Sequence, residues 1–293
     1  MPDLPRLKPD PIPRIHPVAE YAATGELADT YERTKTGFGV PWMGVVAMAF
    51  AHYPTFFGTL WSGFEPLAGS REFVEACGAL RARAEEAALQ LEPSPLVGDL
   101  ADLGYAKREV EEIRALNEVF SHGNMPYLMI ATAARLLLEG HALGDGGSTS
   151  PFEGRRGPSN ENRLSLMEAH HVDAPTAALY DDIKATLGLP FVNTDYRAFA
   201  RWPSYFSLAW RELAKKVPTD AYEAQLAEVH DFAVEQMRAL PNPGDLTSEK
   251  LIRAAQQDGA ADEITEVVRL FQRLLPGLVV NVAFLRHQLG TDA

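Results

Sequence analysis

Apolar residues recur along most of the chain at the three- and four-residue spacing of amphipathic helices. In the first half, this pattern predicts helices over residues 17–36, 42–51, 55–68, 71–91, 99–119 and 126–139. In the second half, it predicts helices over residues 175–187, 194–201, 203–216, 219–239, 248–257 and 263–289. No run shows the convincing alternation of a strand. The chain is therefore expected to be all-α, with five or six helices in each half.

The two halves of the chain resemble each other in sequence. Shifting the chain by 149 residues aligns residues 30–61 with residues 179–210 without a gap. The ten identical pairs among these 32 positions are Tyr31/Tyr180, Lys35/Lys184, Gly39/Gly188, Pro41/Pro190, Ala49/Ala198, Phe50/Phe199, Ala51/Ala200, Pro54/Pro203, Phe57/Phe206 and Trp61/Trp210. A thinner match at a shift of 150 residues pairs Pro126/Pro276, Ala133/Ala283 and Gly140/Gly290. These matches predict a tandem repeat of two similar helical halves.

Changes in composition divide the chain into four segments. Residues 1–17 contain six prolines and are expected to form an extended, stiff arm. Residues 18–140 form the first helical repeat and residues 169–293 the second. Between them, residues 141–168 are rich in glycine, serine and proline, as expected of a linker.

Charge and cysteine content restrict the partners and the compartment. The formal net charge of -13 argues against nucleic acids and anionic membrane surfaces as partners. No run reaches the roughly 18 apolar residues of a membrane span, and the first residues lack the apolar core of a signal peptide. Cys77 is the only cysteine, so no intrachain disulfide can form, and we expect a cytoplasmic protein.

Asp195 is the acid that the predicted scaffold does not require. In the repeat it lies opposite Val46, and residues 193–195 (Asn-Thr-Asp) replace residues 44–46 (Gly-Val-Val) in an apolar stretch. An acid in the first turn of a helix is most often a capping residue. Polar groups that replace apolar ones within an apolar region are instead candidates for a functional site.

A similar comparison marks Asn124, which lies opposite Leu274. Because it follows Gly123, it also fits a turn or a helix cap. Trp42 lies opposite Phe191, so an aromatic residue precedes each of the two equivalent helix starts. Asn124 in the first half and Asp195 in the second are thus each a polar residue opposite an aliphatic one.

Other signals of chemistry are weak. His170, His171 and Asp173 lack an accompanying set of Cys or Glu residues at metal-ligand spacing, so no metal site is predicted. The chain contains no nucleophile elbow, phosphate-binding loop or dinucleotide fingerprint. Cys77 lies in an alanine-rich helical stretch, where packing is its expected role.

Three short motifs in this two-copy order resemble the group I 2-haloacid dehalogenases that accept both D- and L-substrates. They are Asn-Thr-Asp-Tyr-Arg after Gly-Leu-Pro (188–197), Gly-Asn-Met-Pro-Tyr (123–127) and Val-Pro-Trp (40–42). The resemblance extends over nearly the whole chain. It implies an all-α pseudo-dimer of two repeats, assembled as a homodimer, without cofactor or metal. Such enzymes replace the halogen at C2 by hydroxyl with inversion, through direct attack of water.

The resemblance also implies roles for individual residues. Asp195 corresponds to the base that activates water, and Asn124 to its helper. The residues that would bind the haloacid are Trp42, Gly44, Val45, Tyr127, Asn193 and Thr194. Related enzymes tend to have a larger aromatic residue at the position of Val45 and a small residue at that of Asn193. These departures concern substrate size and halogen preference.

Physical arguments are compatible with that reaction. Two opposed helix N-termini offer backbone N–H groups that can hold a substrate carboxylate without an arginine. They also favour an ionised Asp195, whereas apolar walls disfavour ionisation, and the sequence does not rank these two influences. A pocket between pseudo-symmetric halves would accept both enantiomers.

Three alternatives stay open at this stage. Asp195 could act as a nucleophile that forms an ester, as carboxylates do in other hydrolases. The chain could be a binding protein for small acids that has kept the fold without the activity. It could also be a related hydrolase of a 2-substituted acid without halogen, to which Asn193 and Val45 would be suited.

Overall fold

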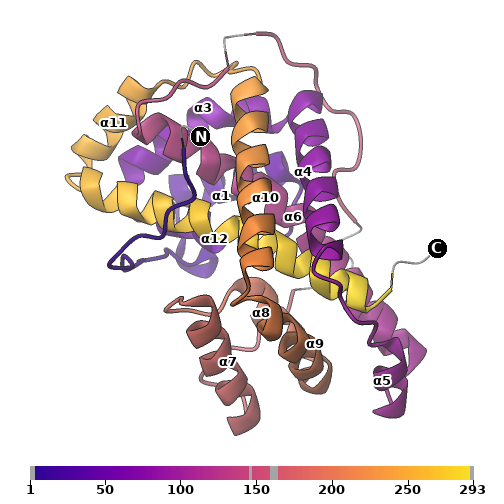
Figure 1. Ribbon diagram of the computed structural model, residues 1–293. Helices are drawn as coiled ribbons and strands as arrows, with labels where there is room; N and C mark the ends of the chain where they lie inside the picture. Colours follow the sequence, from indigo (N-terminus) through magenta and orange to yellow (C-terminus); the bar gives the residue numbers. More distant parts are fainter. Residues whose placement is uncertain (1–3, 145–146, 159–163, 291–293) are drawn as a thin grey trace.

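The structure is a computed structural model that describes residues 4–144, 147–158 and 164–290. These residues form twelve α-helices and one short 3-10 helix, and the only β-type pairing among them is an isolated bridge between Ser70 and Pro151. The predicted all-α class is confirmed. Figure 1 shows α7, α8 and α9 grouped at one end of the molecule, beside the layers of longer helices.

The elements of the first half are η1 (Glu20–Ala22), α1 (Glu26–Phe38), α2 (Val45–Phe50), α3 (Pro54–Ala68), α4 (Arg71–Leu89), α5 (Val97–Asp102) and α6 (Lys107–Leu138). Those of the second half are α7 (Ala174–Leu187), α8 (Thr194–Phe199), α9 (Pro203–Lys216), α10 (Asp220–Ala239), α11 (Ser248–Gln257) and α12 (Ala261–Gln288). Local sequence explains several boundaries. Gly39 and Gly188 end α1 and α7 in the left-handed region, with φ of 67° and 63°.

Several predicted boundaries in the first half were wrong. The helix expected over residues 17–36 is the short η1 followed by α1, which begins only at Glu26. We expected separate helices over residues 99–119 and 126–139, but α6 continues through Pro126, and a short α5 precedes it. Proline removes one helical hydrogen bond and usually breaks or kinks a helix. In α6 the residues on both sides of Pro126 are buried. Their packing therefore stabilises helical backbone where local propensity alone favours a stop. Pro276 lies inside α12 in the same way.

The two longest helices form the centre of the core. α12 packs along α6 and also contacts α4, while α10 covers α4 and α6 (Figure 1). α12 is long and apolar enough to cross a membrane, but 89% of its most apolar window is buried inside the protein. Its apolarity is therefore explained by its place in the core.

Contacts between helix ends join the two halves. Near the end of α11, the carboxylate of Asp258 accepts hydrogen bonds from the backbone N–H groups of Thr55 and Phe56 at the start of α3, at 3.1 and 2.7 Å. At the start of α9, the N–H of Tyr205 donates to the hydroxyl of Tyr105 at 3.2 Å. Each half thus caps a helix of the other. The division into repeats 18–140 and 169–293 stays a prediction, since the helices of both pack into one core.

The described part of the proline-rich arm lies on the chain's own helices. Leu4 is fully buried. The Arg135 guanidinium donates to the carbonyl of Pro5 at 2.8 Å, and Arg6 Nε donates to the carbonyl of Arg273 at 3.1 Å. The arm is therefore tied to α6 and α12. Part of the predicted linker, residues 145–146 and 159–163, lies outside the described residues.

Candidate active site

The starts of α2 and α8 face one small cavity. Gly44 and Asn193 are the N-cap residues of these helices, and both have extended backbones. The first helical hydrogen bonds are donated by the N–H of Met48 to Gly44 and by that of Arg197 to Asn193, at 3.1 and 3.2 Å. In the first turns of α2 and α8, the backbone N–H groups that precede those of Met48 and Arg197 make no helical hydrogen bond. They can therefore donate hydrogen bonds to groups in the cavity.

The two predicted catalytic residues contact each other at this cavity. Asp195 lies in the first turn of α8, and Asn124 lies in α6, 71 positions earlier in the chain. The Asn124 amide Nδ2 donates a hydrogen bond of 2.6 Å to Asp195 Oδ1. Both side chains are buried, with exposures of 2% for Asp195 and 3% for Asn124. Asp195 is therefore not a solvent-exposed capping residue.

Burial raises the pKa of the Asp195 carboxyl from its ordinary 3.8 to about 6. The Asn124 amide and the backbone N–H of Asp195 itself oppose this rise, because hydrogen bonds to a carboxylate stabilise its ionised form. Arg197, which is paired with Glu168 at 2.8 Å, opposes it as well. The apolar surroundings thus outweigh the charge-stabilising groups. The result is a carboxylate that is ionised at neutral pH and more basic than an exposed aspartate.

Two glycines let the aromatic residues pack closely around the pair. A Cβ atom at Gly123 would lie 2.8 Å from Trp42 Cζ3 and closer still to Cη2. A Cβ atom at Gly44 would lie 2.9 Å from the ring carbons of Tyr127. The Tyr127 hydroxyl donates to the carbonyl of Trp42 at 2.6 Å. The motif at 123–127 therefore contributes a gap for Trp42, an amide for Asp195 and a phenol that fixes the backbone before α2.

All eight residues predicted from the sequence line this cavity, which has a volume of about 30 Å³. Its remaining lining residues are Val46, Phe191, Phe271, Leu274, Leu275 and Leu278. The last four belong to α12 and were missed by the sequence analysis, since they read as ordinary core positions. The repeat contained one signal for them, because Leu274 is the position that matches Asn124.

The side chain of Asn193 is not used by the helix that it precedes. It occupies the N-cap position, but its side chain makes no capping hydrogen bond. Its Oδ1 atom is buried and has no hydrogen-bond partner within the described part of the chain. The Asn193 amide therefore retains unused hydrogen-bonding capacity at the cavity wall.

A much larger cavity of about 1070 Å³ adjoins the small one, and both are lined by Trp42, Val45, Phe191 and Thr194. The small cavity has room for only about one or two water molecules. A larger ligand therefore has to displace side chains of the cavity wall to reach Asp195.

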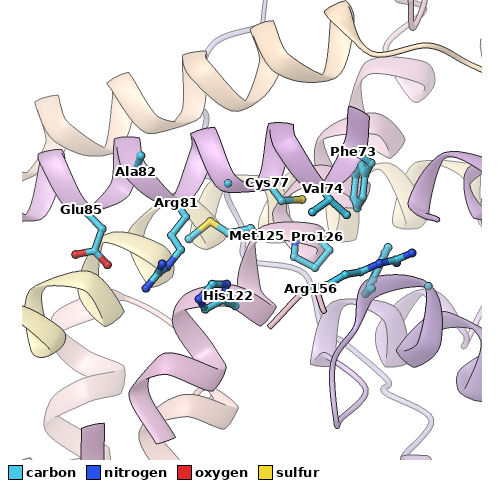
Figure 2. A pocket seen from close by; sticks show the side chains of 13 residues that line it. Phe73, Val74, Cys77, Arg81, Ala82, Glu85, His122, Met125, Pro126 and Arg156 are labelled. Carbon is cyan, nitrogen blue, oxygen red and sulfur yellow. The ribbon is translucent and has the colours of Figure 1, made fainter. Parts of the chain in front are cut away.

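The remaining candidates lie apart from the site. His170 and His171 lie in a turn with ring centroids 3.9 Å apart. Among the described residues, no three His, Cys, Asp or Glu side chains are grouped to hold a metal ion. Cys77 lines a separate cavity of about 270 Å³ between α4 and α6, near Phe73, Met125 and Arg156 (Figure 2). Burial raises the pKa of its thiol, as expected for a packing residue.

Two sequence relatives cover most of the chain. An (R)-2-haloacid dehalogenase of Rhizobium sp. (strain NHG3) is 50% identical over 254 residues, which are 86% of this chain and 98% of that protein. An (R)-2-haloacid dehalogenase of Pseudomonas putida is 36% identical over 94% of this chain and 92% of its own length. No family model matches the chain.

Further comparisons agree with these relatives. A configuration-inverting 2-haloacid dehalogenase of Pseudomonas sp. (strain 113) is 22% identical over 94% of this chain and 91% of that protein. A solved structure of a D-2-haloacid dehalogenase in complex with L-LA superimposes with a TM-score of 0.90 at 34% sequence identity. The match covers 98% of this chain and 100% of that one.

Proposed function

Because this chain belongs to the 2-haloacid dehalogenase family, we propose that it hydrolyses short 2-haloalkanoic acids to 2-hydroxy acids, with Asp195 as the base. The observation that carries the proposal is the buried Asp195–Asn124 pair, placed in an apolar cavity where two helices begin. A base in such a place can take a proton from one water molecule that bulk solvent does not reach.

The proposed reaction is a single displacement at C2. A water molecule held by Asp195 and the Asn124 side chain transfers a proton to the carboxylate as its oxygen attacks C2. The new carbon–oxygen bond forms while the carbon–halogen bond breaks, and the electron pair leaves with the halide ion. Attack opposite to the leaving group inverts the configuration. The proton on Asp195 returns to solvent after the products leave.

Backbone groups can hold the substrate carboxylate. The N–H groups at the start of α2 precede the helical hydrogen-bond ladder and face the same cavity as Asp195. Because α2 has only six residues, its contribution comes from these local donors rather than from a long helix dipole. Such donors fix the orientation of C2 relative to Asp195.

We further propose that the enzyme prefers the (R)-acid. A pseudo-symmetric pocket would let both enantiomers react, but the walls around Asp195 differ between the α2 and α8 ends of the cavity. Polar Asn193 and Thr194 line the cavity at the start of α8, whereas Val45 and Val46 line it at the start of α2. The two relatives with the higher identities are also named for the (R)-acid.

Halide release from each enantiomer of 2-chloropropionate, followed by chiral analysis of the lactate formed, tests the reaction and the preference together. The (R)-acid should give (S)-lactate at least about tenfold faster than the (S)-acid reacts. Absence of halide release from both would favour a binding protein for small acids or a hydrolase of a non-halogenated acid. Equal rates would restore the expectation of a symmetric pocket.

One turnover in heavy-oxygen water with excess enzyme separates water attack from an ester on Asp195. Direct attack places the label in the 2-hydroxy acid during the first turnover. An ester instead places the label in the Asp195 carboxyl group, because water then attacks the ester carbonyl. The proposal requires the first outcome.

The assembly and compartment belong to the same proposal. We propose a cytoplasmic homodimer that works without cofactor or metal, since twofold assemblies are the commonest and the single cysteine suits a reducing compartment. Light scattering of the purified protein tests the dimer. Activity that survives prolonged treatment with chelator tests the independence from metal.

A further inference from the structure

A second cavity adjoins the catalytic cavity and is separate from the large apolar one. It has a volume of about 320 Å³ and lies between the N-terminal arm, the end of α7, α10 and α12. Asn193, Leu274 and Leu278 line both this cavity and the catalytic one. These three side chains therefore form the partition between the two spaces.

The lining of the second cavity is cationic. Arg6, Lys8 and Arg273 line it, and Glu223 is the only carboxylate among its described lining residues. Arg6 is ion-paired with Glu223 and donates to the carbonyl of Arg273. Lys8 Nζ lies over the end of α7, close to Gly188. The cavity thus carries excess positive charge in a protein whose net charge is -13.

Arg273 is the cation of this cavity that lies on α12, next to Leu274 of the partition. It is half-buried, and within the described residues its side chain makes no ion pair or hydrogen bond. Burial and the neighbouring positive charge of Arg6 lower the pKa of its guanidinium group, and the nearby Glu223, which is paired with Arg6, only partly opposes this. A partly desolvated arginine beside a second arginine costs free energy unless an anion compensates it. This arrangement favours a bound anion.

One side chain of the partition is polar. The amide of Asn193 is buried, and its Oδ1 atom is unpartnered within the described residues. By contrast, the other buried polar groups beside it are satisfied: Tyr222 donates to Asn281, which in turn donates to Tyr196, at 3.0 and 2.9 Å. Asn193 is therefore the one polar member of a partition otherwise made of leucines.

We propose that the cationic cavity is an anion-binding antechamber that captures the carboxylate of the 2-haloacid before it passes Asn193 to reach Asp195. The inference rests on the proposed function for the identity of the anion. The large cavity suits this role less well, because its cations Lys184 and Arg197 are accompanied by Glu20 and Glu168. Its charge is balanced, whereas that of the antechamber is not.

Chloride line broadening in ³⁵Cl NMR tests anion binding without any turnover. The wild-type protein should broaden the chloride signal, and sodium propionate should reverse the broadening. Arg273→Gln should lose at least half of the effect. Lys184→Gln removes the same charge at the other cavity and should keep it. Equal broadening by wild type and Arg273→Gln would overturn the antechamber. Broadening that propionate leaves unchanged would indicate a halide site and overturn carboxylate capture.

Kinetics give the second measurement. For (R)-2-chloropropionate at low salt, Arg273→Gln should raise KM about tenfold with kcat within about twofold, and the salt dependence of kcat/KM should flatten. Lys184→Gln should change neither. If Arg273→Gln fails to fold, Lys8→Gln on the arm provides the same comparison. Unchanged KM in the folded variants would overturn the proposal. If the wild-type protein releases no halide, the proposed function is wrong. Anion binding in the cavity is then decided by the NMR measurement alone.

Discussion

The Asp195 carboxyl group lies where ionisation costs free energy, and this cost sets the pH range in which it acts as a base. Burial holds its pKa at about 6, above the ordinary 3.8, despite the hydrogen bond from Asn124. The base is active when ionised. We therefore expect kcat/KM to rise with pH through about 6 and to level off above about pH 7.

Replacing Asn124 by alanine should move the rise of kcat/KM at acidic pH, the acidic limb of the pH profile, to higher pH. The Asn124 amide stabilises the ionised carboxylate, so its removal raises the pKa of Asp195 further. Turnover should also fall by roughly 10²-fold, since the water loses one of its two supports. The pH dependence of kcat/KM for the wild type and the variant measures both effects.

Asn117→Ala is a matched control for that measurement. Asn117 is also a buried asparagine on α6, but its amide donates to the carbonyl of Val282 at 3.2 Å, away from Asp195. Its removal should lower the free energy of unfolding by about 1 to 3 kcal/mol and leave the acidic limb in place. An identical limb in Asn124→Ala and wild type would contradict the role assigned to Asn124.

Asp195→Asn should abolish activity and stabilise the protein at alkaline pH. Because the folded pKa of about 6 exceeds the ordinary 3.8, the protonated carboxyl favours the folded state. That contribution is complete below pH 3.8 and is lost as pH rises through about 6. The full difference is on the order of 3 kcal/mol. The variant should therefore resist urea better than wild type at about pH 8 and lose roughly half of that advantage at about pH 5.

A less stable variant at alkaline pH would show that the carboxylate contributes to the fold. In the repeat, the matching position of the first half is Val46, so the fold does not depend on a charge there. Circular dichroism of the variant distinguishes a folded, inactive protein from a misfolded one.

Among the helices, α6 brings a close-packed glycine, an amide and a phenol to the site within residues 123–127. Gly123 leaves the gap that Trp42 fills, so alanine at this position forces the indole ring to move. We expect Gly123→Ala to lose about 1 to 3 kcal/mol of unfolding free energy. It should also lower kcat/KM by about tenfold or more, because a displaced Trp42 changes the cavity wall.

Gly78→Ala provides the comparison. Gly78 is a helical glycine in α4, and no neighbouring side chain or other helix lies within 4 Å of the position that a Cβ atom would occupy there. Alanine at this position should stabilise the protein by about 0.4 to 1 kcal/mol through the unfolded chain and leave the kinetics unchanged. If Gly123→Ala and Gly78→Ala have the same kcat/KM, the close approach of Trp42 to Gly123 is not required for catalysis.

The sequence predicted the helices better than it predicted which of their residues meet. Periodicity and the flanking proline and glycine residues located α3, α7 and α9 closely, because those signals are local. The course of α6 through Pro126 depends on packing that no local signal records. The comparison of halves singled out Asp195 and Asn124, since a polar residue opposite an aliphatic one is visible in a repeat. The α12 wall was not visible, because leucines at a site and leucines in a core are alike in sequence.

At the scale of the whole molecule, both halves of the chain contribute residues to the catalytic cavity. Asn124 comes from the first half, Asp195 from the second, and the apolar wall from α12. α12 in turn is buried against α4 and α6 of the first half. Neither half therefore buries its own apolar surface or completes the site by itself, although the sequence predicts two similar repeats.

We expect each half to be unstable when it is produced alone. A fragment of residues 169–293 would expose the face of α12 that α6 and α4 cover, and a fragment of residues 1–140 would expose the matching face of α6. Far-ultraviolet circular dichroism with urea titration should show no cooperative transition for either fragment, whereas the full chain should unfold in a single transition.

Mixing the two fragments sharpens this test. If the halves recognise each other through α6 and α12, the mixture should regain a cooperative transition and, with both Asn124 and Asp195 present, halide release. Fragments that carry Asp195→Asn should restore the transition without the activity. A fragment of either half that unfolds cooperatively by itself would instead mean that each repeat has its own core, and that the mutual caps at α3 and α9 only join two independent domains.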